Sequence, residues 1–142
     1  MTLNRAFITK KLGELQGYIG EVQDFFSLSD DEILADKRKV HAAERLLQLV
    51  VDTVIDINQH IIKERDLEPT DDFQSTFYTL AEHRVFPGEF AEKIAPVVGL
   101  RNRIVHRYET VDLARFIKTF RGNYQDFEEY SRLMQTYIEN SP

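Results

Sequence analysis

The residues of this 142-residue chain that are best suited to chemistry lie close together in its C-terminal third. Residues 101–108 read Arg-Asn-Arg-Ile-Val-His-Arg-Tyr, with three arginines, one histidine and no acidic residue. An arginine stays protonated at neutral pH and can donate two hydrogen bonds to one phosphate group. A histidine titrates near neutrality and can accept and return a proton. These residue types suit a site that holds a phosphate and transfers a proton.

The spacing of these residues leaves several arrangements open. In an ideal helix Arg101 and His106 lie about 140° apart around the axis, whereas Asn102 and His106 share one face. The arginine and the histidine can converge if the helix ends here, if the Arg101 side chain folds over, or if a second subunit completes the site. Ile104 and Val105 are expected to anchor this turn in the core. Arginines at the end of a helix also offset its dipole and cover apolar neighbours, which is the alternative without chemistry.

The elements that position this cluster are expected to be helices. Proline occurs only at positions 69, 87, 96 and 142, glycine occurs six times, and strand-like alternation is scarce. Apolar residues recur at intervals of three and four, which predicts helices at about 3–26, 40–62, 73–81 and 87–105, and one or two between 111 and 138 hinged near Gly122. Ser29 and Glu32 predict a capping box after the first helix, and Pro96 and Gly99 are expected to bend the fourth.

The predicted fold is an all-α, antiparallel four- to five-helix up-down bundle, in a single domain that spans residues 1–142. Segment 40–62 is apolar over so much of its circumference that it is either central to the bundle or covered by a partner chain.

Composition excludes several classes of protein. The chain has no cysteine, which excludes a disulfide framework, thiolate catalysis and cysteine-based zinc sites. A chain without cysteine is consistent with the reducing cytoplasm, which is the location that we expect. We expect no secretory signal, because the first 20 residues carry charge throughout and have no apolar segment followed by small residues. We expect no membrane span, because no stretch approaches about 18 apolar residues. The formal net charge is −6, so any contact with nucleic acid needs a local basic patch.

The cluster and its surroundings resemble the HEPN-domain proteins, and most closely the HepT toxin group. The string R-N-R-I-V-H-R-Y fits the motif R-x-x-x-x-H-x-Y of these proteins. The resemblance covers roughly residues 5–135. It includes E-R-L-L-Q at 44–48, D-I at 56–57, H-I-I at 60–62, F-A-E-K at 90–93, V-G-L at 98–100 and V-D-L at 111–113.

The resemblance implies a homodimeric, HEPN-like bundle that acts as a metal-independent endoribonuclease toxin of a type VII-like toxin–antitoxin pair. Such an enzyme cuts RNA, either tRNA or mRNA, in a cleft between two copies, needs no cofactor or metal, and leaves a 2′,3′-cyclic phosphate. Carried over to this chain, Arg101 and His106 are the catalytic pair and Asn102 supports them. Arg103 and Arg107 would bind RNA phosphates, and two copies of Arg101, Arg103 and Arg107 would gather about six positive charges in the cleft.

The resemblance also implies a partner, a cognate minimal nucleotidyltransferase antitoxin that silences the toxin by adding AMP to Tyr108. The resulting O-AMP-tyrosine would bring bulk and negative charge to the place where a substrate phosphate binds. An alternative is a non-catalytic HEPN module that binds a nucleotide or RNA, or that only docks the partner.

Other residues give weaker indications of a functional site. Asp52, Asp56 and His60 are spaced by four residues, and they either hold a metal ion or form a solvated or interface face. His41 and His83 have no convincing partner nearby. The chain has no glycine-rich phosphate loop and no H-E-x-x-H, which speaks against an NTPase or a zinc protease.

Overall fold

The computed structural model of the chain describes residues 3–106 and 112–141, and the regular elements in these two ranges are all helices. Eight helices lie in the described ranges. They are α1 (Arg5–Phe25), α2 (Asp30–Leu34), α3 (Lys37–Glu64), α4 (Gln74–Glu82), α5 (Gly88–Ile94), α6 (Val97–His106), α7 (Leu113–Asn123) and α8 (Gln125–Glu139). None of them is both long and apolar enough to cross a membrane.

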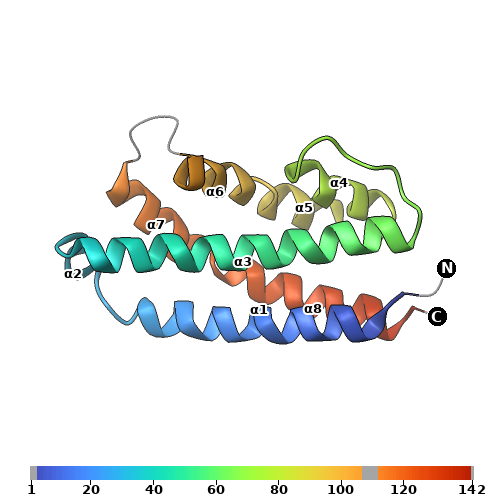
Figure 1. Cartoon of the computed structure of the whole chain (residues 1–142), viewed down its shortest axis with the longest axis horizontal. Coiled ribbons are helices and arrows are strands. Elements are labelled where there is room, and N and C mark those ends of the chain that lie inside the picture. The colour runs from blue at the N-terminus through green and yellow to red at the C-terminus, as the bar shows by residue number, and fades with distance from the viewer. Residues whose placement is uncertain (1–2, 107–111, 142) are drawn as a thin grey trace.

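The helices form an up-down bundle with the long helix α3 at its centre (Figure 1). Helix α1 runs antiparallel to α3 and packs against it, and α5 and α6 return in succession, with α6 against α3. Helices α7 and α8 run back again, with α7 against α2 and α3 and α8 against α1. The all-α bundle predicted from the sequence is confirmed. It has more helical segments than predicted, because α2 forms a separate short helix and the predicted helix at 87–105 is divided into α5 and α6.

The breaks have local causes. Pro96 has no backbone N–H and separates α5 from α6, whereas Gly99, which was also expected to bend this region, lies inside α6. Helices α7 and α8 meet at Tyr124, close to the predicted hinge. The capping box that starts α2 is present, because Ser29 Oγ accepts from the N–H of Glu32 and the Glu32 carboxylate accepts from the N–H of Ser29, both at 3.1 Å.

Much of the wide apolar surface of α3 is covered within a single copy of the chain. Val51, Ile55 and Ile62, which lie beside the regular apolar seam of this helix, are buried. Helix α3 packs against α1, α2, α4, α6 and α7, so most of its circumference faces other helices. A central position in the bundle therefore accounts for these three residues, whereas Leu46 and Leu49 of the same surface are only partly buried.

A buried polar network joins α8, α3 and α4. The Tyr130 hydroxyl donates to Asn58 Oδ1 at 2.6 Å, and Asn58 Nδ2 donates to Thr76 Oγ1 at 3.0 Å. Thr76 in turn donates to the carbonyl of Phe73 at 2.6 Å. Burial raises the pKa of the Tyr130 phenol well above its usual value, so the phenol stays protonated as a donor.

A second anchor, Arg121 of α7, holds the turn between α1 and α2. Its guanidinium donates to the carbonyls of Phe26 at 2.9 Å and Leu28 at 2.6 Å, and to Asp30 Oδ1 at 2.8 Å. The same group lies 4.7 Å from the centre of the Phe26 ring. The planar fork of arginine suits three acceptors at once, and the carbonyls at the end of α1 gain partners that the helix itself does not supply.

Candidate functional site

Helix α6 carries the arginine- and histidine-containing motif and is anchored by its apolar face. Val98, Leu100 and Ile104 are buried against the bundle. Val105, which was expected to be buried with Ile104, is instead 37% exposed. Successive helical residues are about 100° apart, so once Ile104 faces the core Val105 falls on the face of Arg101, four residues earlier. This face is where the predicted site lies.

The Arg101 side chain is held against α3 by Asp52. A single carboxylate oxygen of Asp52, Oδ1, accepts from Arg101 Nε at 3.0 Å and lies 2.9 Å from Nη2. The Arg101 side chain is 16% exposed and the Asp52 side chain 39% exposed. One edge of the guanidinium is therefore occupied by the protein, and the carboxylate fixes the direction in which the rest of the group points.

Asn102 supplies a second contact to the same guanidinium. Its Oδ1 accepts from Arg101 Nη1 at 3.0 Å. A guanidinium has five N–H donors, and within the described residues Asp52 and Asn102 take three of them, so two are left for a ligand. Because α6 is helical through His106, Asn102 lies one turn before His106 on nearly the same face. Arg101 thus contacts Asn102, whereas the convergence of Arg101 with His106 stays a prediction.

Part of the predicted site lies outside the described residues. The backbone of His106 forms the last residue of α6, but its side chain is not among the described groups. Arg107 and Tyr108 also lie outside the described residues. Arg101, Asn102 and Asp52 are thus the members of the site whose geometry the structure gives.

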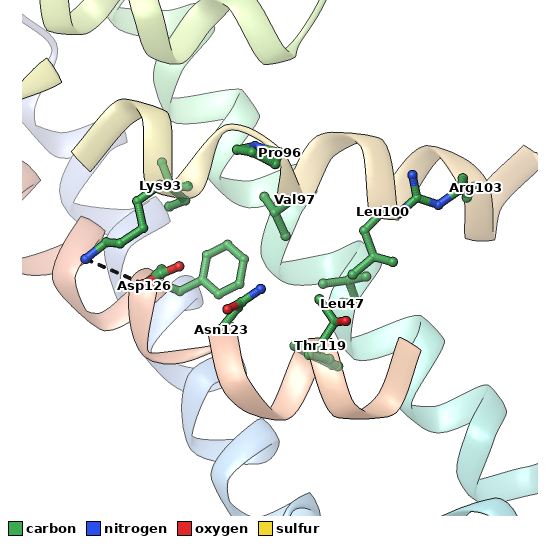
Figure 2. Close-up of a pocket in the computed structure, with 12 residues that line it drawn as sticks. Leu47, Lys93, Pro96, Val97, Leu100, Arg103, Thr119, Asn123 and Asp126 are labelled. Atoms are coloured by element: carbon green, nitrogen blue, oxygen red, sulfur yellow. Dashed lines mark ion pairs between the residues drawn. The ribbon is translucent and has the colours of Figure 1, made fainter. Parts of the chain in front are cut away.

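Arg103 lies on a different side of α6 from Arg101. The two residues are about 200° apart around the helix axis, and Arg103 borders a cavity of about 150 Å³ between α5–α6 and α7–α8. Figure 2 shows this cavity, with Leu47 and Leu100 on one side and Thr119 and Asn123 on the other. Within one copy of the chain, Arg101 and Arg103 do not face a common surface.

The far end of this cavity holds an ion pair (Figure 2). Lys93 Nζ lies 3.7 Å from Asp126 Oδ1 and 2.7 Å from Glu129 Oε2. Partial burial raises the pKa of Asp126 above its usual value, and the neighbouring Lys93 opposes that rise. The charge of Lys93 is therefore balanced within the protein.

The acidic stripe of α3 does not converge on one point. Asp52 pairs with Arg101, Asp56 pairs with Lys11 at 3.4 Å, and the His60 ring stacks on Phe7 with 4.2 Å between ring centres. Sequence reasoning considered Asp52 as a metal ligand or as part of a solvated or interface face, and not as a partner of Arg101. Its pairing with the motif depends on the packing of α3 against α6, which local sequence does not report.

The two histidines that seemed isolated in the sequence have carboxylate partners. His41 Nδ1 lies 3.0 Å from Glu44 Oε1, one turn along α3, and His83 Nε2 lies 3.0 Å from Glu68 Oε2. The first pair was within reach of sequence reasoning, because residues three apart on a helix are neighbours. The second pair joins Glu68, in the long turn between α3 and α4, to His83 at the end of α4.

Comparison with known proteins gives consistent results. A family model described as "Ribonuclease HepT-like" matches residues 15–134. The chain is 30% identical over 131 residues to the "tRNA nuclease HepT" of Aphanizomenon flos-aquae, covering 92% of this chain and 89% of that protein. It is 25% identical over 121 residues to the "mRNA nuclease HepT" of Shewanella oneidensis, covering 85% and 83%.

Solved structures share the fold. A tri-AMPylated Shewanella oneidensis HEPN toxin, in complex with MNT antitoxin, superposes with a TM-score of 0.84 at 22% identity over 91% of this chain and 96% of that one. YutE of Bacillus subtilis, a cytosolic protein of unknown function, gives 0.83 at 16% identity over 98% and 94%. The family match over most of the chain and the 30% identity to a curated relative agree with the motif on α6, and the protein belongs to the ribonuclease HepT-like family.

Proposed function

We propose that this protein is an endoribonuclease toxin of a toxin–antitoxin pair, cutting tRNA or mRNA at the site formed by Arg101 and His106. The observation that carries the proposal is the setting of Arg101, whose guanidinium is held by Asp52 and Asn102 and keeps two N–H groups for a ligand. The two curated relatives, a tRNA nuclease and an mRNA nuclease, support RNA as the substrate.

In this proposal Arg101 binds the phosphate that is attacked. Its two remaining N–H groups donate to the two non-bridging oxygens, and its charge stabilises the additional negative charge of the phosphorane. Asp52 and Asn102 hold the guanidinium before substrate arrives, so the group does not have to be ordered during the reaction. Asp52 acts through Arg101 and is a positioning residue.

His106 is the proton-transfer group of the proposed reaction. Its imidazole removes the proton from the ribose 2′-hydroxyl, and the 2′-oxygen forms a bond to phosphorus. The bond from phosphorus to the 5′-oxygen breaks, and the imidazolium returns the proton to that oxygen. The products are a 2′,3′-cyclic phosphate and a 5′-hydroxyl. His106 makes both proton transfers in this reaction, and Arg101 stabilises the negative charge of the phosphorane. The proposed mechanism therefore uses no metal ion.

We further infer that the active form is a homodimer. Two copies that face each other through α6 would bring two Arg101 and two Arg107 side chains together, giving a basic cleft in a chain of net charge −6. The assignment of Arg103 to phosphate binding stays a prediction, and a cleft on the Arg101 face does not use it. Light scattering at micromolar concentration tests the dimer, and a monomeric mass contradicts it.

The partner in this proposal is a minimal nucleotidyltransferase that adds AMP to Tyr108. Support comes from the Shewanella oneidensis HEPN toxin of the same fold, which is tri-AMPylated and in complex with MNT antitoxin. Tyr108 lies two residues beyond His106, where an added phosphate would repel the substrate. Co-expression with the cognate nucleotidyltransferase should add the mass of AMP to the intact chain and remove RNA cleavage, whereas a Tyr108→Phe chain should gain no adduct at this position.

The decisive test is cleavage of labelled tRNA and mRNA by protein with unmodified Tyr108, in excess EDTA. We expect cleavage with cyclic phosphate ends, which is lost in His106→Ala and in Arg101→Ala. His83→Ala and Arg38→Ala remove the same side-chain types away from the site and should cut like the wild type. If no RNA is cut although RNA is still bound, the non-catalytic binding module is the better description. If His106→Ala cuts normally, the role given to that residue is wrong.

A further inference from the structure

A groove between α3 and α6 continues the Arg101 site along the surface of α3. It has a volume of about 280 Å³, slightly below the range of about 300–1,000 Å³ that is typical of pockets for drug-sized ligands. A space of this size suits one nucleobase. The groove is lined by His41, Glu44, Arg45, Gln48, Ile104 and Val105.

The groove lies next to the phosphate-binding group. Gln48 precedes Asp52 by four residues, which is one turn, or about 6 Å, along α3. Val105 follows Arg101 by four residues on α6 and so lies one turn beyond it on the same face. A nucleotide whose phosphate is held by Arg101 can therefore place a neighbouring base in the groove without leaving the surface of the two helices.

The walls of the groove present hydrogen-bond donors. Arg45 Nη1 donates to Gln48 Oε1 at 3.2 Å, which occupies the amide oxygen and leaves the Gln48 amide N–H groups to donate. Arg45 is exposed and has further N–H groups. Glu44, the acidic residue of the groove, is buried and pairs with His41 at 3.0 Å.

The floor is apolar. Ile104 is buried beneath the groove, and Val105 presents a 37% exposed apolar side chain that neither donates nor accepts. A flat aromatic base can cover this side chain and remove it from water while its edge meets the donors of Arg45 and Gln48. An apolar floor beside directional donors is the arrangement by which pockets orient a planar ligand.

We propose that this groove is a nucleobase subsite, which receives the base next to the attacked phosphate and prefers guanine or uracil over adenine or cytosine. The inference rests on the proposed RNA cleavage and adds its base preference. Guanine offers O6 and N7, and uracil offers O4, as acceptors to Arg45 and Gln48. Adenine and cytosine carry an amino group where guanine has O6 and uracil has O4. This amino group is a donor and would face the donors of Arg45 and Gln48 without forming a hydrogen bond.

The test is cleavage of an RNA pool randomised around the cut, with the bases on both sides of the cut read by sequencing. The wild type should enrich guanine or uracil at one position beside the cut. Arg45→Gln and Gln48→Leu should each reduce that enrichment about tenfold, in line with the discrimination that one good base contact provides. Arg38→Gln is the matched control, because it removes the same charge from α3 at a residue that pairs with Asp36 outside the groove.

The outcomes separate the subsite from the reaction. If the wild type cuts without base preference, or if Arg45→Gln and Gln48→Leu keep the wild-type preference, the subsite is wrong and the proposed cleavage stands. If the wild type cuts no RNA, both fail. If either variant turns a dimer into a monomer and the remaining activity keeps its preference, the groove is a contact between copies and the subsite is overturned.

Discussion

Replacing Asp52 with alanine is expected to lower the free energy of unfolding by about 1–2 kcal/mol, because the Arg101 guanidinium loses the oxygen that binds it on one edge. A fully exposed ion pair contributes about 0–1 kcal/mol, and breaking a fully buried one costs about 3–5 kcal/mol. The pair lies between these cases, since Arg101 is 16% and Asp52 39% exposed. Water can partly replace the lost carboxylate, so the expected cost of about 1–2 kcal/mol is closer to that of the exposed pair than to that of the buried one.

A double-mutant cycle isolates the pair from the other contacts of each residue. Asp52→Ala, Arg101→Ala and the double variant are unfolded in urea, and unfolding is followed by the helical circular dichroism signal. We expect a coupling energy of about 1 kcal/mol, above the roughly 0.3–0.5 kcal/mol within which independent sites are additive. A coupling energy indistinguishable from zero would refute the argument that Asp52 holds Arg101.

The same variant tests the positioning role in catalysis. If Asp52 orients Arg101 toward the phosphate, Asp52→Ala should slow RNA cleavage by up to about 100-fold, the size of effect that a small misplacement can have. Asp56→Ala removes an acidic residue one turn further along α3, where it pairs with Lys11, and should cut at the wild-type rate. Equal rates for Asp52→Ala and the wild type would mean that Arg101 needs no carboxylate to act.

Three further predictions concern stability and pH. Arg121→Ala should lower the free energy of unfolding in urea by about 2–3 kcal/mol, because three acceptors lose their donor. Arg121→Lys should recover less than half of this loss, since an ammonium cannot reproduce the planar fork of the guanidinium. A full recovery of the wild-type stability in Arg121→Lys would contradict this. Tyr130→Phe should lower the unfolding free energy by about 1–2 kcal/mol, because the buried Asn58 oxygen loses its donor, and an unchanged melting temperature would be the contrary result. The pKa of Asp126 is raised by burial, so the folded state holds this proton more tightly than the unfolded state and loses stability as pH rises through the raised pKa. Asp126→Asn should therefore gain stability relative to the wild type as the pH rises above about 3.9, the usual pKa of an aspartate, and a relative loss over that rise would reverse the assigned sign.

The helices were predictable because their signals are local. The apolar spacing of α3, the capping box at Ser29 and the missing N–H of Pro96 act within a few residues, and each marks an element or a break in the structure. The location of the motif on a helix was predictable for the same reason. Gly99, which was expected to bend this region together with Pro96, lies inside α6, because a glycine with ordinary helical neighbours on both sides weakens a helix without ending it.

The site was predictable only in part, because its geometry depends on which helices are neighbours. The importance of Arg101 was visible in the sequence, but Asp52 is 49 residues away and meets it only because α6 packs on α3. Val105 differed from expectation for a simpler reason. A helix turns about 100° per residue, so Val105 does not share the buried side of its neighbour Ile104. The same rotation separates Arg103 from Arg101, and phosphate binding by Arg103 stays a prediction.

The buried bonds of Tyr130 have a consequence for how the bundle chooses among similar packings. The apolar seam of α3 repeats every three or four residues, so sliding this helix by one turn, about 5.4 Å, would offer its neighbours side chains of nearly the same kind. Asn58 meets Tyr130 and Thr76 in one of these registers, and a slide would leave buried polar groups unpaired. It would also carry Asp52 past Arg101. A hydroxyl in the core on α8 thus sets the axial alignment of an ion pair on the surface between α3 and α6.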